Sequence, residues 1–173
     1  MENWTEKYRP KTLDEIIGNR DAVEQLTEWA EKWGKIPQKA VILSGPAGVG
    51  KTSSAHALAN DFGWEVIELN ASDARNKDII KRIALSGAVN ETFRCSGEYI
   101  SSAKGGRKLI ILDEADNLYE KGEDYGGKRA IVETIDSTQQ PIILIVNDYY
   151  KLIKGSGQYL KNLCKHIKFN PVK

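Results

Sequence analysis

A glycine-rich segment between an apolar run and a helix-forming run limits the possible folds of this chain more than any other feature. Residues 45–52 read Gly-Pro-Ala-Gly-Val-Gly-Lys-Thr and follow the apolar run 40–43. They match the pattern G-x-x-x-x-G-K-[ST], which requires a strand before it and a helix after it. In that setting, N–H groups of the glycine turn and the positive end of the helix hold phosphate oxygens. The segment therefore predicts a nucleotide site on an α/β fold.

Each residue of this segment has an expected role at the phosphates. The predicted nucleotide-binding residues are Gly45, Pro46, Ala47, Gly48, Val49, Gly50, Lys51, Thr52 and Ser53. We expect Lys51 to reach the β- and γ-phosphate oxygens, where it also serves catalysis, and the Thr52 hydroxyl to hold Mg²⁺. The alternative is a glycine turn with an accidental lysine. The four fixed positions recur by chance in about one such chain in a hundred or two, and the strand–turn–helix context weakens that alternative further.

Apolar runs typical of strands alternate along the chain with segments typical of helices. The predicted strands span residues 40–43, 64–69, 109–112, 142–146 and 166–169. The predicted helices span residues 12–18 (opened by a capping box at 12–15), 19–34 (with Asn19 as cap), 51–62, 78–85, 127–137 and 158–164. Residues 86–107 predict a long exposed insertion. The alternation predicts a parallel sheet with helices on both faces, whose ligands bind at the carboxyl ends of the strands.

Two carboxylates follow the apolar run 109–112. Asp113, at the strand end beside the predicted phosphate loop, is expected to contact Mg²⁺ directly or through water, and Glu114 to polarise an attacking water. Two acids on a buried strand are costly unless a cation or hydrogen bonds compensate them. The alternative is a solvated turn that opens a helix, because acids suit a helix N-terminus. The phosphate loop upstream favours the catalytic interpretation.

An amide side chain follows the run 142–146. Asn147 is expected to align the attacking water or to contact the γ-phosphate, because an amide donates and accepts hydrogen bonds at once. Taken alone, Asn-Asp after a strand is more often a plain turn. The catalytic hypothesis for Asn147 therefore depends on the two motifs that precede it.

Length and composition indicate one α/β domain without a membrane span. The 173 residues suffice for a single core, and the longest apolar runs are too short to cross a bilayer. The N-terminus has no apolar stretch of a secretory signal. Cys95 and Cys164 have no metal-binding spacing and suit a reducing compartment, so we expect a cytoplasmic protein. The chain stops soon after its last predicted strand, as if a following domain had been cut away or lies elsewhere.

Beyond these motifs, the chain resembles the clamp-loader family within the AAA+ class of P-loop ATPases. Trp4-Thr-Glu-Lys-Tyr-Arg-Pro10 is similar to the N-terminal box of clamp-loader subunits, and residues 68–73 and 113–116 are similar to further boxes of that family. Residues 126–148 resemble large subunits more than small ones. The resemblance covers essentially the whole chain, so it implies that residues 1–173 form an AAA+ nucleotide-binding domain, with lid and collar domains absent from this chain.

The resemblance also implies an activity and partners. ATP and Mg²⁺ would drive opening of a ring-shaped sliding clamp and its loading onto primer–template DNA, in a hetero-oligomer with small subunits. Tyr8, Arg9 and Pro10 would lie against the adenine. Arg75 and Lys81 would follow DNA phosphates, although a plain solvated face remains the alternative. Residues 75–108 hold eight Lys and Arg against three Asp and Glu, which fits phosphate contact.

One departure from the family concerns the arginine that enters a neighbour's ATP site. Small subunits carry Ser-Arg-Cys near the last strand, whereas this chain has Leu163-Cys-Lys-His166 and no arginine after Arg129. Lysine lacks the bidentate fork of an arginine finger. We therefore expect this chain to receive a finger without supplying one, and to be a weak Mg²⁺-dependent ATPase in isolation.

Three other functions compete with this interpretation. Asp113-Glu-Ala-Asp116 occurs literally in DEAD-type helicases, but those need a second motor lobe and a different phosphate loop. A nucleotide-binding structural switch without productive hydrolysis is disfavoured by the presence of both Asp113 and Glu114. Another AAA+ DNA motor is disfavoured by residues 4–10 and 126–148.

Overall fold

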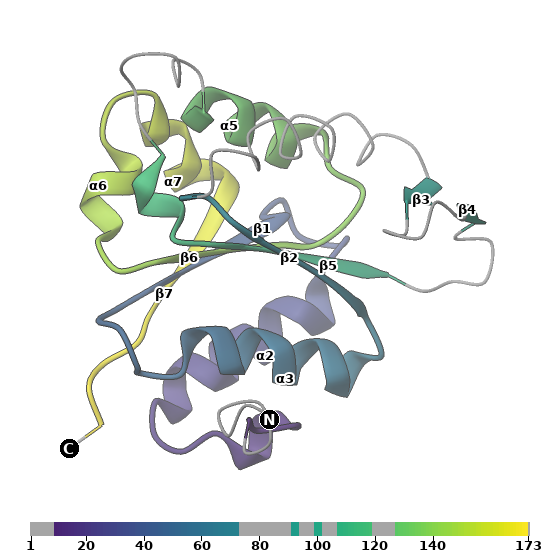
Figure 1. Cartoon of the computed structure of the whole chain (residues 1–173), viewed down its shortest axis with the longest axis vertical. Helices are drawn as coiled ribbons and strands as arrows, with labels where there is room; N and C mark the ends of the chain where they lie inside the picture. Colours follow the sequence, from purple (N-terminus) through teal and green to yellow (C-terminus); the bar gives the residue numbers. More distant parts are fainter. Residues whose placement is uncertain (1–8, 73–90, 94–98, 102–106, 119–126, 173) are drawn as a thin grey trace.

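A five-stranded parallel sheet forms the centre of the molecule (Figure 1). The computed structural model describes residues 9–72, 91–93, 99–101, 107–118 and 127–172. In spatial order the strands are β2 (Glu65–Asn70), β5 (Lys108–Asp113), β6 (Ile142–Val146), β1 (Ala40–Ser44) and β7 (Cys164–Lys168). Every pairing in this sheet is parallel. The carboxyl ends of all five strands therefore lie along one edge.

Helices cover both faces of the sheet, as Figure 1 shows. On one side lie α2 (Arg20–Lys32) and α3 (Lys51–Phe62), and on the other α5 (Gly127–Ser137), α6 (Tyr149–Ile153) and α7 (Leu160–Leu163). Two apolar clusters result, one around Trp29 and Leu58 and one around Leu144 and Ile135. Every residue of β1 and β6 is buried, which explains why these strands are continuous apolar runs. The predicted α/β sheet with helices on both faces is confirmed.

The first predicted helix is shorter than its sequence suggested. Only η1 (Leu13–Glu15), a 3₁₀ turn, forms there, and the Thr12 side chain makes no capping hydrogen bond. The Glu15 carboxylate instead accepts from the backbone N–H of Lys11 at 2.7 Å. The capping box predicted at residues 12–15 is therefore wrong, because its glutamate satisfies a donor outside the turn.

Asn19 stands at the N-cap position of α2, as predicted, but its side chain makes no capping hydrogen bond. The residue has a left-handed backbone (φ 50°), and its side chain bonds to a distant segment. The Asn19 Oδ1 atom accepts from the backbone N–H of Asn170 at 2.7 Å, and its Nδ2 atom donates to the Asn170 carbonyl at 2.8 Å. Asn19 therefore joins the beginning of the fold to its end.

The predicted helix over 158–164 is divided among three elements. A 3₁₀ turn, η4 (Gly155–Tyr159), precedes the short α7, and Cys164 is already the first residue of β7. Cys164 pairs with Ala40 in the parallel register and is buried there. Pairing with β1 thus starts the strand two residues before the predicted position.

Two short strands lie within the predicted insertion 86–107. They are β3 (Glu91–Phe93) and β4 (Tyr99–Ser101), which pair antiparallel with Phe93 opposite Tyr99. Three-residue strands are too short to show a period of two, so the sequence did not indicate them. The predicted helix 78–85 lies outside the described residues. Among the described residues, no helix has the length and hydropathy needed to cross a membrane.

Candidate active site

The glycine-rich loop joins the buried end of β1 to the start of α3, as predicted. Gly50 has φ 94°, a left-handed backbone that favours glycine, and a side-chain carbon placed there would meet nothing within 4 Å. Gly45 also has a positive φ, 151°, and packing excludes a side chain there as well, because a side-chain carbon would lie 2.4 Å from the carbonyl oxygen of Phe169. The loop therefore packs tightly where it leaves the sheet and is open where it enters the helix.

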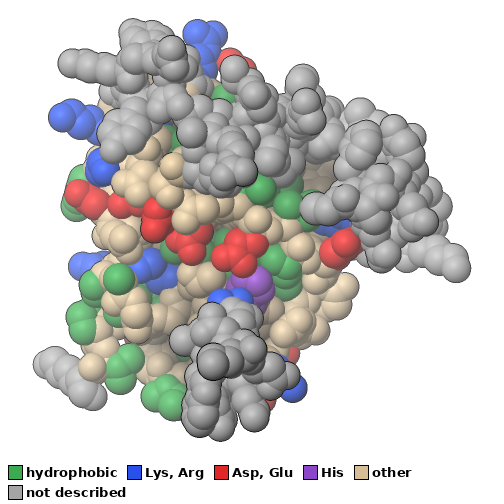
Figure 2. Space-filling model, in the orientation of Figure 1, with side chains coloured by type: hydrophobic (Ala, Val, Ile, Leu, Met, Phe, Trp, Pro, Cys, Tyr) green, Lys and Arg blue, Asp and Glu red, His purple; other side chains and the backbone are tan. Residues whose placement is uncertain are grey.

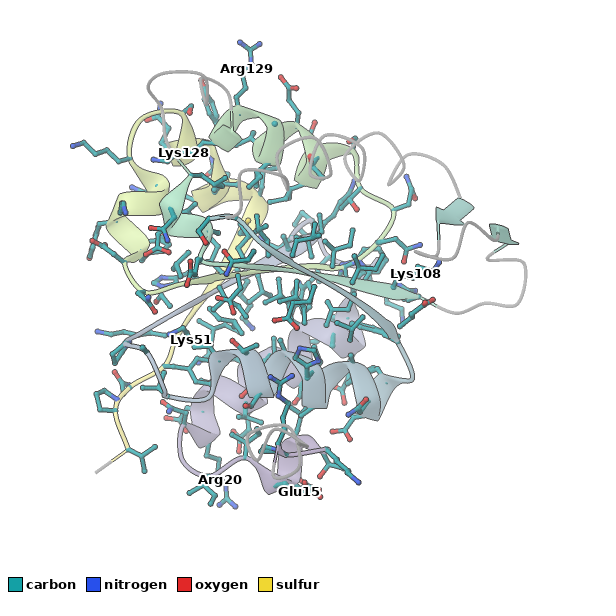
Figure 3. All side chains as sticks on the ribbon, in the orientation of Figure 1. Glu15, Arg20, Lys51, Lys108, Lys128 and Arg129 are labelled. Atoms are coloured by element: carbon teal, nitrogen blue, oxygen red, sulfur yellow. The ribbon has the colours of Figure 1, made fainter. Side chains whose placement is uncertain are left out.

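The Lys51 ammonium lies at the mouth of this loop. Its Nζ atom donates to the carbonyl oxygens of Gly45 (2.6 Å) and Pro46 (2.7 Å) and is 3.3 Å from Asn147 Oδ1. Only 5% of Lys51 is exposed, and this burial lowers its pKa, while the nearby carboxylates Asp113 and Asp116 oppose the lowering. Figure 3 shows Lys51 at one end of the sheet and Lys108 toward the other. The lysine is thus held at the strand-end edge where ligands of parallel sheets bind.

Thr52 and Asp113 are brought together, although 61 residues separate them. The Thr52 hydroxyl donates to Asp113 Oδ2 at 3.1 Å. A hydroxyl and a carboxylate are oxygen ligands of the kind that Mg²⁺ prefers, usually as one or two protein groups beside phosphates and waters. Within the described part of the chain, no group of three or more His, Cys, Asp and Glu could hold a metal by itself. The pair fits a magnesium ion shared with a nucleotide.

Glu114 turns sharply away from the strand that carries Asp113. Its backbone has φ 52°, one of two non-glycine residues with positive φ in the described regions. Its N–H donates to Asp113 Oδ1 at 2.7 Å, and its Oε2 atom accepts from Asn117 Nδ2 at 3.2 Å. The Glu114 carboxylate is therefore held by a residue on the turn that follows. Figure 2 shows acidic side chains gathered in a band across the middle of the visible face, at the level of the sheet.

Asn147 meets the other motifs as predicted. It is the first residue after β6, is exposed, and directs Oδ1 toward the Lys51 ammonium. Strand β6 lies between β5 and β1, so the strand tips that carry Asp113, Asn147 and the phosphate loop are adjacent. The sheet order explains why three motifs far apart in sequence form one site.

Three further residues at this edge were missed as site residues. The 3₁₀ turn η3 (Ala115–Asn117) contains Asp116 and Asn117, and Lys151 lies on α6. Asp116 accepts from the backbone N–H groups of Asn147 and Asp148, and the Lys151 ammonium donates to Asn117 Oδ1 at 3.2 Å. The available signal was an acid and an amide placed two and three residues after Glu114, directly behind a strand end.

The remaining predicted site residues are only partly described. Arg9 and Pro10 precede Lys11, whose carbonyl accepts from Asn60 Nδ2 at 3.1 Å near the far end of α3. That attachment lies about 14 Å along the helix from Lys51 at 1.5 Å per residue. Contact of residues 9 and 10 with adenine stays a prediction. Tyr8, Arg75 and Lys81 lie outside the described residues.

The fold and the site together define a P-loop ATPase core. A glycine-rich loop joins a strand of the parallel sheet to a helix, and an acid, Asp113, and an amide, Asn147, lie at the ends of neighbouring strands. The model of the family named "ATPase family associated with various cellular activities (AAA)" matches residues 41–161. The chain therefore belongs to the AAA family of ATPases. Within that class it is similar to proteins named Replication factor C large subunit, with 56% identity over 171 residues to the one from Methanosarcina mazei and 50% over 167 to the one from Archaeoglobus fulgidus.

These relatives are longer than this chain. The alignments cover 98% and 96% of the chain but 26% and 34% of the two relatives, so the chain spans about a quarter to a third of their length. Solved structures share the fold at lower identity. A katanin from a study of its self-assembly gives a TM-score of 0.64 at 20% identity, covering 92% of this chain and 53% of that chain. The Aeropyrum pernix ORC1 protein in complex with DNA gives 0.63 at 20% identity, covering 96% and 48%.

Proposed function

We propose that this chain is the ATP-binding and ATP-hydrolysing module of the large subunit of a sliding-clamp loader. The observation that carries the proposal is the meeting of Lys51, Asn147, Thr52 and Asp113 at one strand-end edge. The Replication factor C large subunits, which share 56% and 50% sequence identity with this chain, support assignment to that kind of assembly. Residues 1–173 would form its nucleotide-binding domain, and lid and collar domains would belong to the rest of the protein.

Each residue of the site would have a separate role in ATP binding and hydrolysis. Backbone N–H groups of residues 45–52 and the Lys51 ammonium would bind the β- and γ-phosphates. Thr52 and Asp113 would hold Mg²⁺, which supplies charge neutralisation at the phosphates when bound. Glu114 would polarise the attacking water, and Asn147 would align that water or contact the γ-phosphate. Preorganised charges of this kind stabilise the transition state without reorganising during the reaction.

The proposed partners are the small clamp-loader subunits, a sliding clamp and primer–template DNA. Arg75 and Lys81 would contact DNA phosphates without reading bases, because a clamp loader acts at any sequence. A neighbouring subunit would supply an arginine finger to the site of this chain. Tyr8, Arg9 and Pro10 would contact the adenine.

By resemblance to the family, Lys165 would stand at the place of the small subunits' finger arginine, and its side chain is bound within its own chain. Its Nζ atom donates to the Gln25 carbonyl at 3.3 Å and lies 3.8 Å from Glu28 Oε2. Both partners are on α2. A side chain bound in this way supports the proposal that the chain receives a finger without giving one.

The test uses the full-length protein assembled with its small subunits. We expect Glu114→Gln to bind Mg²⁺–ATP with an affinity close to wild type and to lose about 100-fold or more in hydrolysis by its own site. The readouts are nucleotide titration with and without Mg²⁺, and turnover in assemblies where the other sites are inactivated. Absence of Mg²⁺-dependent ATP binding in the wild type would refute the proposal. If the wild-type site binds ATP but does not hydrolyse it, and Glu114→Gln changes nothing, the result would favour a nucleotide-binding switch instead.

A further inference from the structure

A buried carboxylate beside the site uses only one of its two oxygens. Asp116 is 5% exposed. Its Oδ2 atom accepts from the backbone N–H groups of Asn147 (3.3 Å) and Asp148 (3.0 Å), whereas Oδ1 is buried without a hydrogen-bond partner in the described structure. Burying a carboxylate is costly unless it is compensated, and an unsatisfied buried oxygen requires a physical explanation. Packing alone would be served better by an apolar side chain of similar volume.

The two hydrogen bonds of Asp116 connect the strand tips that carry the catalytic candidates. Asp116 lies on η3, directly after Asp113 and Glu114. The N–H groups that it accepts belong to the chain leaving β6. Asn147 is exposed and follows the end of its strand, so Asp116 is the acceptor that fixes the backbone from which the Asn147 amide reaches Lys51.

Helix capping does not account for this arrangement. Helix α6 already has an N-cap, because Asp148 Oδ1 accepts from the N–H of Lys151 at 3.2 Å. The N–H of Asn147, which donates to Asp116, belongs to the residue before that N-cap and is not one of the helix N–H groups that a cap satisfies.

We propose that Asp116 is a positioning residue for ATP hydrolysis, which holds the backbone of Asn147 so that its amide stays beside Lys51 where the γ-phosphate and attacking water are to bind. The inference rests on the proposed function, because it assigns Asp116 to the same site. Asp116 acts through Asn147 and touches no phosphate itself. Its removal therefore affects turnover more than nucleotide affinity.

The experiment uses the full-length protein in its assembly with small subunits, with the other ATP sites inactivated. We expect Asp116→Ala to lower kcat about 10- to 100-fold, the range for a misplaced catalytic group, while the Kd for Mg²⁺–ATP changes by less than about threefold. Asp116→Asn retains an acceptor oxygen, so it should keep kcat within about fivefold of wild type. The exposed Asp136→Ala on α5 is the matched control and should leave kcat and Kd unchanged.

A double-mutant cycle with Asn147→Ala separates positioning from a general structural effect. Because Asp116 acts through Asn147, Asp116→Ala should lower kcat by less than about twofold further in an Asn147→Ala background. The inference is overturned by wild-type kcat in Asp116→Ala, by losses that multiply in the double variant, or by equal losses in Asp116→Asn and Asp116→Ala. If Asp116→Ala does not fold, Asp116→Leu replaces it in the same cycle, since it keeps the branched shape of the side chain and removes both acceptors. A wild type that binds no ATP counts against the proposed function, whereas the outcomes above concern Asp116 alone.

Discussion

At the scale of single residues, His166 shows how the neighbourhood of the phosphate loop affects stability. Its Nε2 atom is 2.7 Å from the Ser44 hydroxyl, at the residue before the loop, and its ring stacks on Tyr149 with centroids 3.7 Å apart. Partial burial, and to a lesser degree the Lys168 charge, lower the pKa of His166 below its ordinary value. The folded chain therefore binds this proton less readily than the unfolded chain.

The pH dependence of unfolding follows from that direction. Near and below pH 6.5, the unfolded chain binds more protons at His166, so the free energy of unfolding should fall as the pH is lowered through this range. His166→Gln should remove the part of this fall in the free energy of unfolding that comes from protonation of His166. Denaturant titrations at pH 5, 6 and 7 measure it, with His56→Gln as the control that keeps the effect. Equal slopes for the wild type and His166→Gln would contradict the prediction.

At the scale of elements, the turn η4 depends on a glycine with no space for a side chain. A carbon added to Gly157 would lie 1.9 Å from the carbonyl oxygen of Leu152, in the last turn of α6. Backbone atoms would have to move to admit it. The glycine therefore allows η4 to pack closely against α6.

Gly157→Ala should accordingly lower the free energy of unfolding by about 1–3 kcal/mol, the range for overpacking in a dense region. The matched control is Gly127→Ala at the start of α5, where the added carbon would lie at an ordinary 3.5 Å from Leu118. That variant should be neutral or more stable by about 0.4–1 kcal/mol, because alanine restricts the unfolded chain. Denaturant unfolding compares the two, and equal effects would refute the packing explanation.

At the scale of the whole molecule, Asn19 and Asn170 link segments that are 151 residues apart. The same C-terminal segment is bound to the strand end that precedes the phosphate loop, because the Phe169 N–H donates to the Ser44 carbonyl at 2.7 Å. The two exposed Asn19 hydrogen bonds should contribute about 1 kcal/mol in total. Asn19→Gly removes them and preserves the left-handed backbone, whereas Asn19→Ala adds about 1 kcal/mol of backbone strain. Denaturant unfolding should therefore rank Asn19→Ala below Asn19→Gly, and the reverse order would contradict this account.

A second prediction at this scale concerns the assembly. Lys165→Ala should leave the ATPase rate of the complete complex within about twofold of wild type, because Lys165 binds α2 of its own chain and lacks a guanidinium fork. Turnover of the assembled complex provides the measurement, with assembly checked by size. A drop of about 100-fold at unchanged assembly would identify Lys165 as a group that acts on a neighbouring site.

Much of this protein was determined by the sequence alone. The strand–loop–helix around residues 45–52 and the helices 51–62 and 127–137 were predicted, because periodicity and glycine spacing are local signals. The juxtaposition of Lys51, Thr52, Asp113 and Asn147 was predicted because ligands of a parallel sheet bind at the carboxyl ends of its strands. Only the tertiary structure decided the bonds from Asp116 to Asn147 and from Asn19 to Asn170, and the start of β7 at Cys164. Those features depend on which strand lies beside which and in what register. A polar side chain bonds to whatever backbone groups the packed sheet brings near it, and no local propensity specifies that partner.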